Sequence, residues 1–279
     1  MNQPLIYLSV STSSTTTKSL LAHRIRSLLV NNFNNNYDAS FAVEPRKRKH
    51  TNVFLLDGGT GEELIANGVP YDSKIWSARA IIEDQYHVTV EKVHKSFISS
   101  GCDAITTNSY GIVPGVGFSK AEMARYCSVA GQIARNSVRN AKPHDVPKNV
   151  EADPTFVLGS LGPLVESYHA DNILSRENGI EYYSVAIQAL QPYVDAFIAE
   201  TISSSEEAMQ VLYACSSELS NHPRDSNAET DLVLLLFISF TVNYDGCLCS
   251  DENIVAAISN VLDCQESICS NVQSKYGID

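Results

Sequence analysis

Short apolar runs alternate with longer amphipathic segments from residue 53 to the end of the chain. A short, uninterrupted apolar run is typical of a parallel strand that is buried on both faces. Apolar residues spaced by three and four positions are typical of a helix with one buried face. The predicted strands are 53–57, 104–108, 156–160, 196–201 and 232–242.

Helices are predicted between these strands, each with a one-sided apolar stripe. The stripes are Val90, Val93 and Phe97; Met123, Cys127, Ala130 and Ala134; Tyr183, Ile187, Leu190 and Val194; and Ala208, Leu212 and Cys215. Ser203-Ser-Ser-Glu206-Glu207 precedes the last stripe with Ser-x-x-Glu capping boxes. Repeated strand–helix units imply right-handed crossovers and a parallel sheet. The predicted class is therefore α/β, either a (β/α)8 barrel or a doubly wound sheet.

Residues 1–52 differ from the rest of the chain and are predicted to form a disordered leader. They are rich in Ser, Thr and Asn, and no acid precedes Asp38. Leu20, Leu21, Ile25, Leu28 and Leu29 repeat at helical spacing, with arginines between them. Amphipathic, Arg-bearing and acid-poor sequences are typical of organelle transit peptides, and an unprocessed disordered extension is the alternative.

Charge and cysteine usage limit the partners and the location. Residues 1–52 carry a net charge of +5 and residues 53–279 a net charge of −17, which together give −12. So acidic a body disfavours nucleic-acid binding, and no apolar run approaches the ~20 residues of a membrane span. The odd count of seven cysteines points to reduced thiols inside a cell. The expected location is cytoplasmic or, if residues 1–50 are a transit peptide, mitochondrial or plastid.

The strongest candidate site residue is Asp57, where the first predicted strand meets Gly58-Gly-Thr-Gly61. An anion at this position can hold a cationic group, while Gly58 and its neighbours let the backbone approach a ligand. A turn former or a helix cap is the alternative for Asp57. A phosphate loop is disfavoured, because no Gly-Lys-Ser/Thr follows and an acid would repel phosphate.

Polar residues also end the next three predicted strands. Thr107 and Asn108 suggest a hydrogen-bonding shelf for a small polar ligand, although a buried Thr on a strand is common. Ser160 lies in Gly159-Ser-Leu-Gly-Pro163, whose glycines either present backbone N–H groups to the site or only allow a turn. Glu200 ends the fourth strand, and a carboxylate there is costly to bury unless it is paired. A substrate ammonium is the natural partner of this acid.

Other residues are assigned non-functional roles. His87, His94 and His169 have no partners at ligand spacing and are predicted to lie on the surface or on a helix face. Trp76 is predicted to be a packing residue. Cys247-Leu-Cys249 is interpreted as two thiols in a loop, because zinc sites usually separate paired cysteines by at least two residues.

Several motifs together resemble the homocysteine-binding domain of the homocysteine S-methyltransferases. They occur in family order from about residue 53 to the C-terminus. They are Leu56-Asp-Gly-Gly-Thr-Gly61, Ile75-Trp-Ser-Ala78, Val93-His94, Gly101-Cys-Asp-Ala-Ile-Thr-Thr-Asn-Ser-Tyr110, Leu158-Gly-Ser-Leu-Gly-Pro163, Ala199-Glu-Thr-Ile202 with Glu207-Ala208, and Ile238-Ser-Phe240.

The resemblance implies a (β/α)8 TIM-type barrel, of which residues 53–279 would supply about the first five βα units. It implies transfer of a methyl group to homocysteine to give methionine, from S-methylmethionine or S-adenosylmethionine as the small donor. By resemblance, Asp57 and Glu200 would hold the amino group of homocysteine. Thr107 and Asn108 would help to place the substrate backbone.

The resemblance also implies a catalytic zinc held by three cysteines, in Gly-Val-Asn-Cys and Gly-Gly-Cys-Cys segments. Neither segment occurs in this sequence. The family's zinc ligands are therefore expected beyond Asp279, no residue is assigned to a metal, and the chain by itself is expected to be inactive. The alternative is a non-catalytic remnant that binds an amino acid or a partner chain. With only five units, the fifth strand is expected to be an exposed, aggregation-prone edge.

Overall fold

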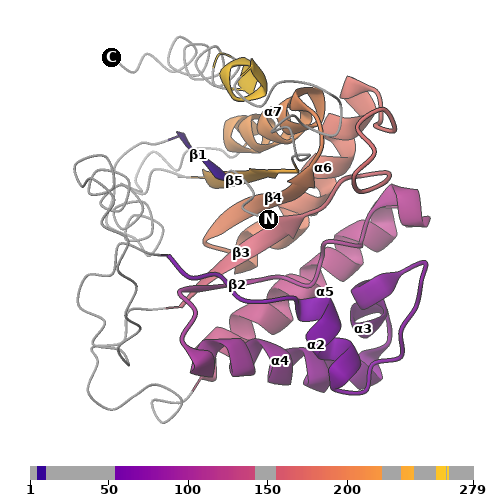
Figure 1. Ribbon diagram of the computed structural model, residues 1–279, viewed down its shortest axis with the longest axis vertical. Helices are drawn as coiled ribbons and strands as arrows, with labels where there is room; N and C mark the ends of the chain where they lie inside the picture. Colours follow the sequence, from indigo (N-terminus) through magenta and orange to yellow (C-terminus); the bar gives the residue numbers. More distant parts are fainter. Residues whose placement is uncertain are drawn as a thin grey trace.

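The computed structural model describes residues 5–10, 54–141, 155–221, 234–241, 256–261 and 263 (Figure 1). Its named strands are β1 (Leu5–Val10), β2 (Ala104–Thr106), β3 (Phe156–Leu161), β4 (Ala196–Ile202) and β5 (Leu234–Phe240). Its α-helices are α2 (Thr60–Ala66), α3 (Arg79–Ile82), α4 (His87–Ser100), α5 (Lys120–Arg139), α6 (Arg176–Leu190) and α7 (Ser205–Asn221). Short 3-10 turns are η1 (Trp76–Ala78), η2 (Asp84–Tyr86), η3 (Pro114–Val116) and η5 (Gln191–Tyr193).

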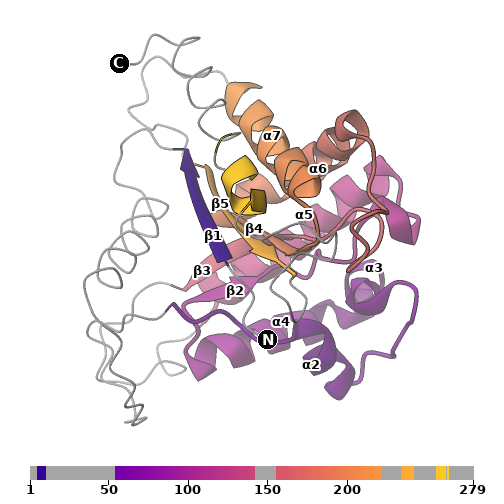
Figure 2. The ribbon, with the colours of Figure 1, turned by 45° about the horizontal axis from the view of Figure 1, so that its top comes forward.

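The sheet has the order β1-β5-β4-β3-β2, and β2 to β5 run parallel in chain order. Helices α5, α6 and α7 lie together on one side of this sheet, as Figures 1 and 2 show. The predicted α/β class with a parallel sheet is therefore confirmed. The first predicted strand is reduced to an extended segment, in which Leu56 forms a single parallel bridge with Ala104.

The two faces of the sheet carry separate apolar clusters. The helix-covered face contributes Ile105, Val157 and Phe197 to a large core shared with the helices, including the four predicted stripes. The opposite face carries a smaller buried cluster. Its members are Ala104, Phe156, Leu158, Ala196, Ile198 and Phe237, with Phe54 and Leu56 packed against it. Side chains alternate along a strand, so every second residue of each strand faces the smaller cluster.

Aspartates fix the amino ends of the strands in a repeated arrangement. Asp103, just before β2, donates its N–H to Leu55 O and accepts the Leu55 N–H on Oδ2 at 2.7 Å. Asp195, just before β4, makes the same pair of bonds with Val157, whose N–H lies 2.8 Å from Oδ2. Arg135 of α5 also pairs with Asp195 at 2.9 Å. These bonds fix how neighbouring strands align at their amino ends, and therefore which residues stand side by side at their carboxyl ends.

Strand β1 differs from what the composition of the leader suggests. It pairs antiparallel with β5, from Leu5 opposite Ser239 to Val10 opposite Leu234. Residues 5–10 are therefore a strand rather than disordered chain, and β5 is not the uncovered edge that was expected. Because β1 pairs with the backbone of β5, β5 is not an open strand edge of the kind that promotes aggregation. The rest of the predicted leader lies outside the described residues, as does the Cys247-Cys249 pair.

His94 lies on a helix face, as expected, but on the buried face of α4, where neither ring nitrogen has a hydrogen-bond partner among the described residues. Burial alone lowers the pKa of His94 to about 4, so this side chain is neutral. The expectation for Trp76 is wrong: this residue is 60% exposed, with a backbone φ of 45°, and does not pack in the core. Among the described residues, no helix is long and apolar enough to cross a membrane.

Candidate functional site

The candidate site lies where the parallel strands end, on the face of the smaller apolar cluster. Thr106, Ser160 and Glu200 each stand two residues beyond a member of that cluster, namely Ala104, Leu158 and Ile198. Alternation along the strands therefore places all three side chains on one face. A polar row thus follows directly above the apolar layer at the carboxyl ends of β2, β3 and β4.

Asp57 joins this row through Thr106. The backbone N–H of Thr106 donates to Asp57 Oδ2 at 2.8 Å, and its hydroxyl lies 3.1 Å from both carboxylate oxygens. Asp57 N in turn donates to Ala104 O at 3.0 Å. Burial raises the pKa of Asp57 to about 7 against the opposing effect of the Thr106 bonds, and the charge of Glu200 adds to the rise.

Glu200 is held by Ser160. The Ser160 hydroxyl donates to Glu200 Oε1 at 2.5 Å, and burial raises the pKa of this carboxyl. The register between β4 and β5 shifts between Ala199 and Ile202, and Thr201 takes a φ of 62°. A positive φ is uncommon for a β-branched residue and marks strain of the kind that clusters at functional sites. The irregularity lies directly after Glu200.

Thr107 faces away from this row and takes part in an internal network. Its hydroxyl accepts the Ser160 N–H at 2.9 Å, and it donates to Ser109 Oγ at 2.7 Å because the single proton of the Ser109 hydroxyl is used elsewhere. Ser109 in turn donates to the carbonyl of Ser160 at 2.7 Å. All three residues are buried. Thr107 therefore ties the end of β2 to the end of β3, and its hydroxyl has no capacity left to donate to a ligand.

Asn108 and Gly58 contact other parts of the fold rather than the polar row itself. The Asn108 side chain is buried and donates to Ser77 O at 2.9 Å, which ties the end of β2 to η1. Gly58 is exposed, and a Cβ there would lie 2.9 Å from Cε1 of Phe97. The structure thus brings Asp57, Glu200 and Ser160 together. Asn108 and Gly58 instead make contacts that hold the surrounding fold.

Thr106 is the site residue that was missing from the predicted set. It donates twice to Asp57, whereas the predicted Thr107 turns inward. The sequence could have indicated Thr106, because it lies two residues after the apolar Ala104 and therefore faces the same side of the strand. A one-residue step along a strand reverses the face, so the choice between two adjacent threonines depends on register.

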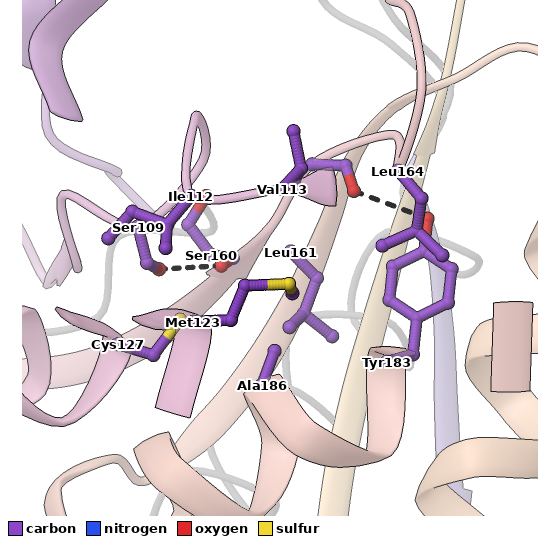
Figure 3. A pocket seen from close by; sticks show the side chains of 11 residues that line it. Ser109, Ile112, Val113, Met123, Cys127, Ser160, Leu161, Leu164, Tyr183 and Ala186 are labelled. Atoms are coloured by element: carbon purple, nitrogen blue, oxygen red, sulfur yellow. Dashed lines mark hydrogen bonds between the residues drawn. The ribbon is translucent and has the colours of Figure 1, made fainter. Parts of the chain in front are cut away.

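Figure 3 shows a second feature, a small pocket between β3, α5 and α6. Met123, Cys127 and Tyr183 are among the side chains that line this pocket of about 10 Å³, and Ser109 and Ser160 lie at its side. A space of this size accommodates at most one water molecule. It lies on the helix side of β3 and is too small for a substrate.

Removing the Ser160 hydroxyl tests whether it positions Glu200. A charge-assisted hydrogen bond contributes about 1.5–3 kcal/mol. We expect Ser160→Ala to weaken binding of an ammonium ligand about tenfold, measured by calorimetric titration. Ser128→Ala, which removes a hydroxyl on α5 that lies 3.3 Å from the Tyr193 hydroxyl, is the control. Unchanged affinity in Ser160→Ala would exclude this positioning role.

The comparisons with known proteins agree on one family. The family model of homocysteine S-methyltransferase matches residues 54–273. The chain belongs to the homocysteine S-methyltransferase family.

Curated relatives show the same relationship over part of their length. The chain is 27% identical over 170 residues to the homocysteine S-methyltransferase of Escherichia coli, covering 58% of this chain and 49% of that protein. It is 33% identical over 113 residues to homocysteine S-methyltransferase 3 of Zea mays, covering 39% and 33%. The chain therefore spans about half the length, or less, of these relatives.

A solved structure shows the same fold. The metallated form of the homocysteine methyltransferase MmuM from Escherichia coli superposes with a TM-score of 0.60 at 20% identity. The match covers 75% of this chain and 70% of that one. At this identity the likeness concerns the fold alone.

Proposed function

We propose that this chain binds homocysteine at the carboxyl edge of its sheet and presents it for methyl transfer to sulfur, giving methionine. One observation carries the proposal. Asp57 and Glu200 meet at that edge, each buried enough to raise its pKa, and no cationic side chain among the described residues contributes to either shift. Two desolvated acids that are bonded only to neutral donors need a positively charged partner. The ammonium group of an amino acid supplies that charge.

The polar row also suits the geometry of such a ligand. An ammonium has three donors and no acceptor, so it pairs with carboxylate oxygens rather than with N–H groups. Thr106 and Ser160 occupy one side of Asp57 and Glu200 with donors, which leaves the remaining carboxylate lone pairs for the ligand. We propose that Asn108 and Gly58 shape the wall beside the bound amino acid, while Thr107 acts through Ser160.

The arrangement of the strands supports a (β/α)8 barrel as the complete architecture. Thr106 is in register with Leu158, and the next member of the polar row, Ser160, lies two residues further. Ser160 is in register with Ile198, and Glu200 again lies two residues further. A constant stagger between neighbouring parallel strands is the consequence of strand tilt in a barrel. Barrel enzymes place their sites at this end of the strands.

Methyl transfer requires a donor and an activated thiol. We propose S-methylmethionine or S-adenosylmethionine as the donor. A family metal such as zinc would supply deprotonation of the homocysteine thiol. The described residues do not fit that role: none of their His, Cys, Asp and Glu side chains form a group of three. Cys102, Cys127 and Cys215 are buried, and burial raises the pKa of Cys127 to about 12. What these residues can do is bind and orient the amino acid.

A pair of ligands that differ only in the amino group tests the proposal. Calorimetric titration of the full chain with homocysteine should show binding, and 4-mercaptobutanoate should bind at least about 30-fold more weakly. An unpaired buried charge costs about 2–5 kcal/mol, which sets this ratio. Equal affinities for the two thiols, or no binding of homocysteine, would refute the proposal. Methionine formation from S-methylmethionine then decides whether binding leads to turnover.

A further inference from the structure

A third carboxyl group, that of Glu207, is buried close to the site but takes no part in the polar row. It lies in the first turn of α7, seven residues after Glu200, and is 3% exposed. Burial raises the pKa of Glu207, and within the part of the chain that the structure describes no cationic side chain contributes to it. Its neighbour Glu206 instead faces Arg176, with which it forms two hydrogen bonds. The two adjacent acids therefore have opposite surroundings.

The Glu207 carboxyl contacts the segment that follows Ser160 and Tyr183 of α6. Leu164 N–H points to Glu207 Oε1 at 3.2 Å, and the hydroxyl of Tyr183 lies 3.2 Å from the same oxygen. That hydroxyl also lies 3.2 Å from Gly162 O. Glu207 and Tyr183 thus bracket the turn Gly162–Leu164 from α7 and α6.

If Glu207 is ionised, the Glu207–Tyr183–Gly162 cluster has too few protons for its hydrogen bonds. Tyr183 has a single hydroxyl proton and two neighbouring acceptors, Gly162 O and Glu207 Oε1. If Glu207 were ionised, one of the two acceptors would lack this proton. A proton on Oε1 satisfies both contacts, because Glu207 then donates to Tyr183 and Tyr183 donates to Gly162.

Distances elsewhere in the same molecule agree with this assignment. The backbone N–H of Val157 approaches the carboxylate of Asp195, which is ion-paired with Arg135, to 2.8 Å. The N–H of Leu164 stops at 3.2 Å from Glu207. Hydrogen bonds to ionised acceptors are shorter than those to neutral ones.

We propose that Glu207 is a neutral carboxylic acid at pH 7 and acts as a positioning residue, donating to Tyr183 and thereby fixing the Gly162–Leu164 turn behind the site. The turn is in contact with the neighbouring loop after β2. Gly115 N donates to Leu164 O at 2.8 Å, and a Cβ on Gly162 would lie 2.4 Å from Tyr110 O. Holding this turn therefore holds both loops that border Ser160.

The surroundings of Glu207 contain little that would ionise it. Facing it from α6 is Tyr183, whose pKa is raised by burial. Tyr110, beyond Tyr183 on the loop after β2, also has a pKa raised by burial. On α7 itself, Glu206 is paired with Arg176, which lies on the outer side. A neutral acid here also spares the site a third negative charge next to Glu200.

Infrared difference spectroscopy tests the protonation state without reference to any ligand. The spectrum of the wild-type chain minus that of Glu207→Gln at pH 7 should show the carbonyl band of a protonated carboxylic acid. The matched control, Glu206→Gln, should remove only carboxylate bands, because its acid is paired with Arg176. A carboxylate band in the Glu207→Gln difference spectrum would overturn the assignment.

The positioning role rests on the proposed function and is tested by homocysteine titration. We expect Glu207→Ala to weaken binding about tenfold, and the neutral, similarly shaped Glu207→Gln to stay within about threefold of wild type. Equal losses in both variants, or none in Glu207→Ala, would overturn the role. If Glu207→Ala does not fold, the wild-type and Glu207→Gln pair still decides it, since a tenfold loss in the latter contradicts a neutral bridge. Failure of the wild-type chain to bind homocysteine would instead refute the proposed function and leave the infrared result standing.

Discussion

Replacing Glu200 by Gln, or Asp57 by Asn, is expected to weaken homocysteine binding by about 100-fold or more. Each substitution keeps the shape of the side chain but removes one of the two charges that face the ligand ammonium. Truncating one partner of a buried, hydrogen-bonded charge pair costs about 2–5 kcal/mol, and 100-fold corresponds to roughly 3 kcal/mol. Calorimetric titration of the folded variants gives the change directly.

A matched substitution separates this effect from a general change in charge. Glu62→Gln removes the same charge from the exposed first turn of α2, five residues from Asp57. Exposed charges are screened by solvent, so we expect its affinity to stay within about twofold of wild type. If all three variants lost affinity equally, or if neither Asp57→Asn nor Glu200→Gln lost any, the two acids would not form the ammonium site.

The stability of the ligand-free protein should fall as the pH rises from about 4 to 7, and Asp57→Asn should remove much of that fall. The pKa of Asp57 is about 7 in the folded chain, against an ordinary value of 3.8 for an aspartate. The folded state therefore binds more protons than the unfolded state in this window, and raising the pH favours unfolding. This is the reverse of the usual effect of an aspartate, whose folded pKa is lowered.

The expected size of this effect is about 2–3 kcal/mol above pH 7, after allowance for solvent screening of a half-buried group. Differential scanning calorimetry should then show Asp57→Asn melting about 4–10 °C above wild type at pH 8, with little difference at pH 4. A variant less stable than wild type at pH 8 would show that Asp57 is stabilised, rather than strained, by its surroundings. The same substitution thus should stabilise the fold and abolish binding.

The sequence alone predicts the parallel sheet because burial on both faces imposes a simple pattern. The runs at 156–160 and 196–201 match β3 and β4 almost residue for residue, and the stripe from Met123 to Ala134 is buried on α5. The segment 53–57 has the same apolar pattern but only one bridge. Pairing depends on a neighbour, which a local pattern does not reveal.

The two candidate acids could be predicted from their positions in the sequence. A carboxylate that ends an apolar strand needs a partner, which points to Glu200, and an acid where a strand meets a glycine-rich loop points to Asp57. Thr106 was missed because the face of each residue depends on where the strand ends. The positive φ of Thr201 was also not predictable, since a β-branched residue gives no signal for that conformation. The leader's composition likewise gave no sign that Leu5–Val10 pairs with β5.

The number of protons released when homocysteine binds tests the central claim most directly. Titrations at pH 6 in two buffers with different heats of ionisation give this number. Because Asp57 is largely protonated at pH 6 and must ionise to hold an ammonium, we predict a release approaching one proton per homocysteine at pH 6, which falls as the pH rises through about 7. Binding at pH 6 without proton release would contradict a paired Asp57–Glu200 site for the amino group.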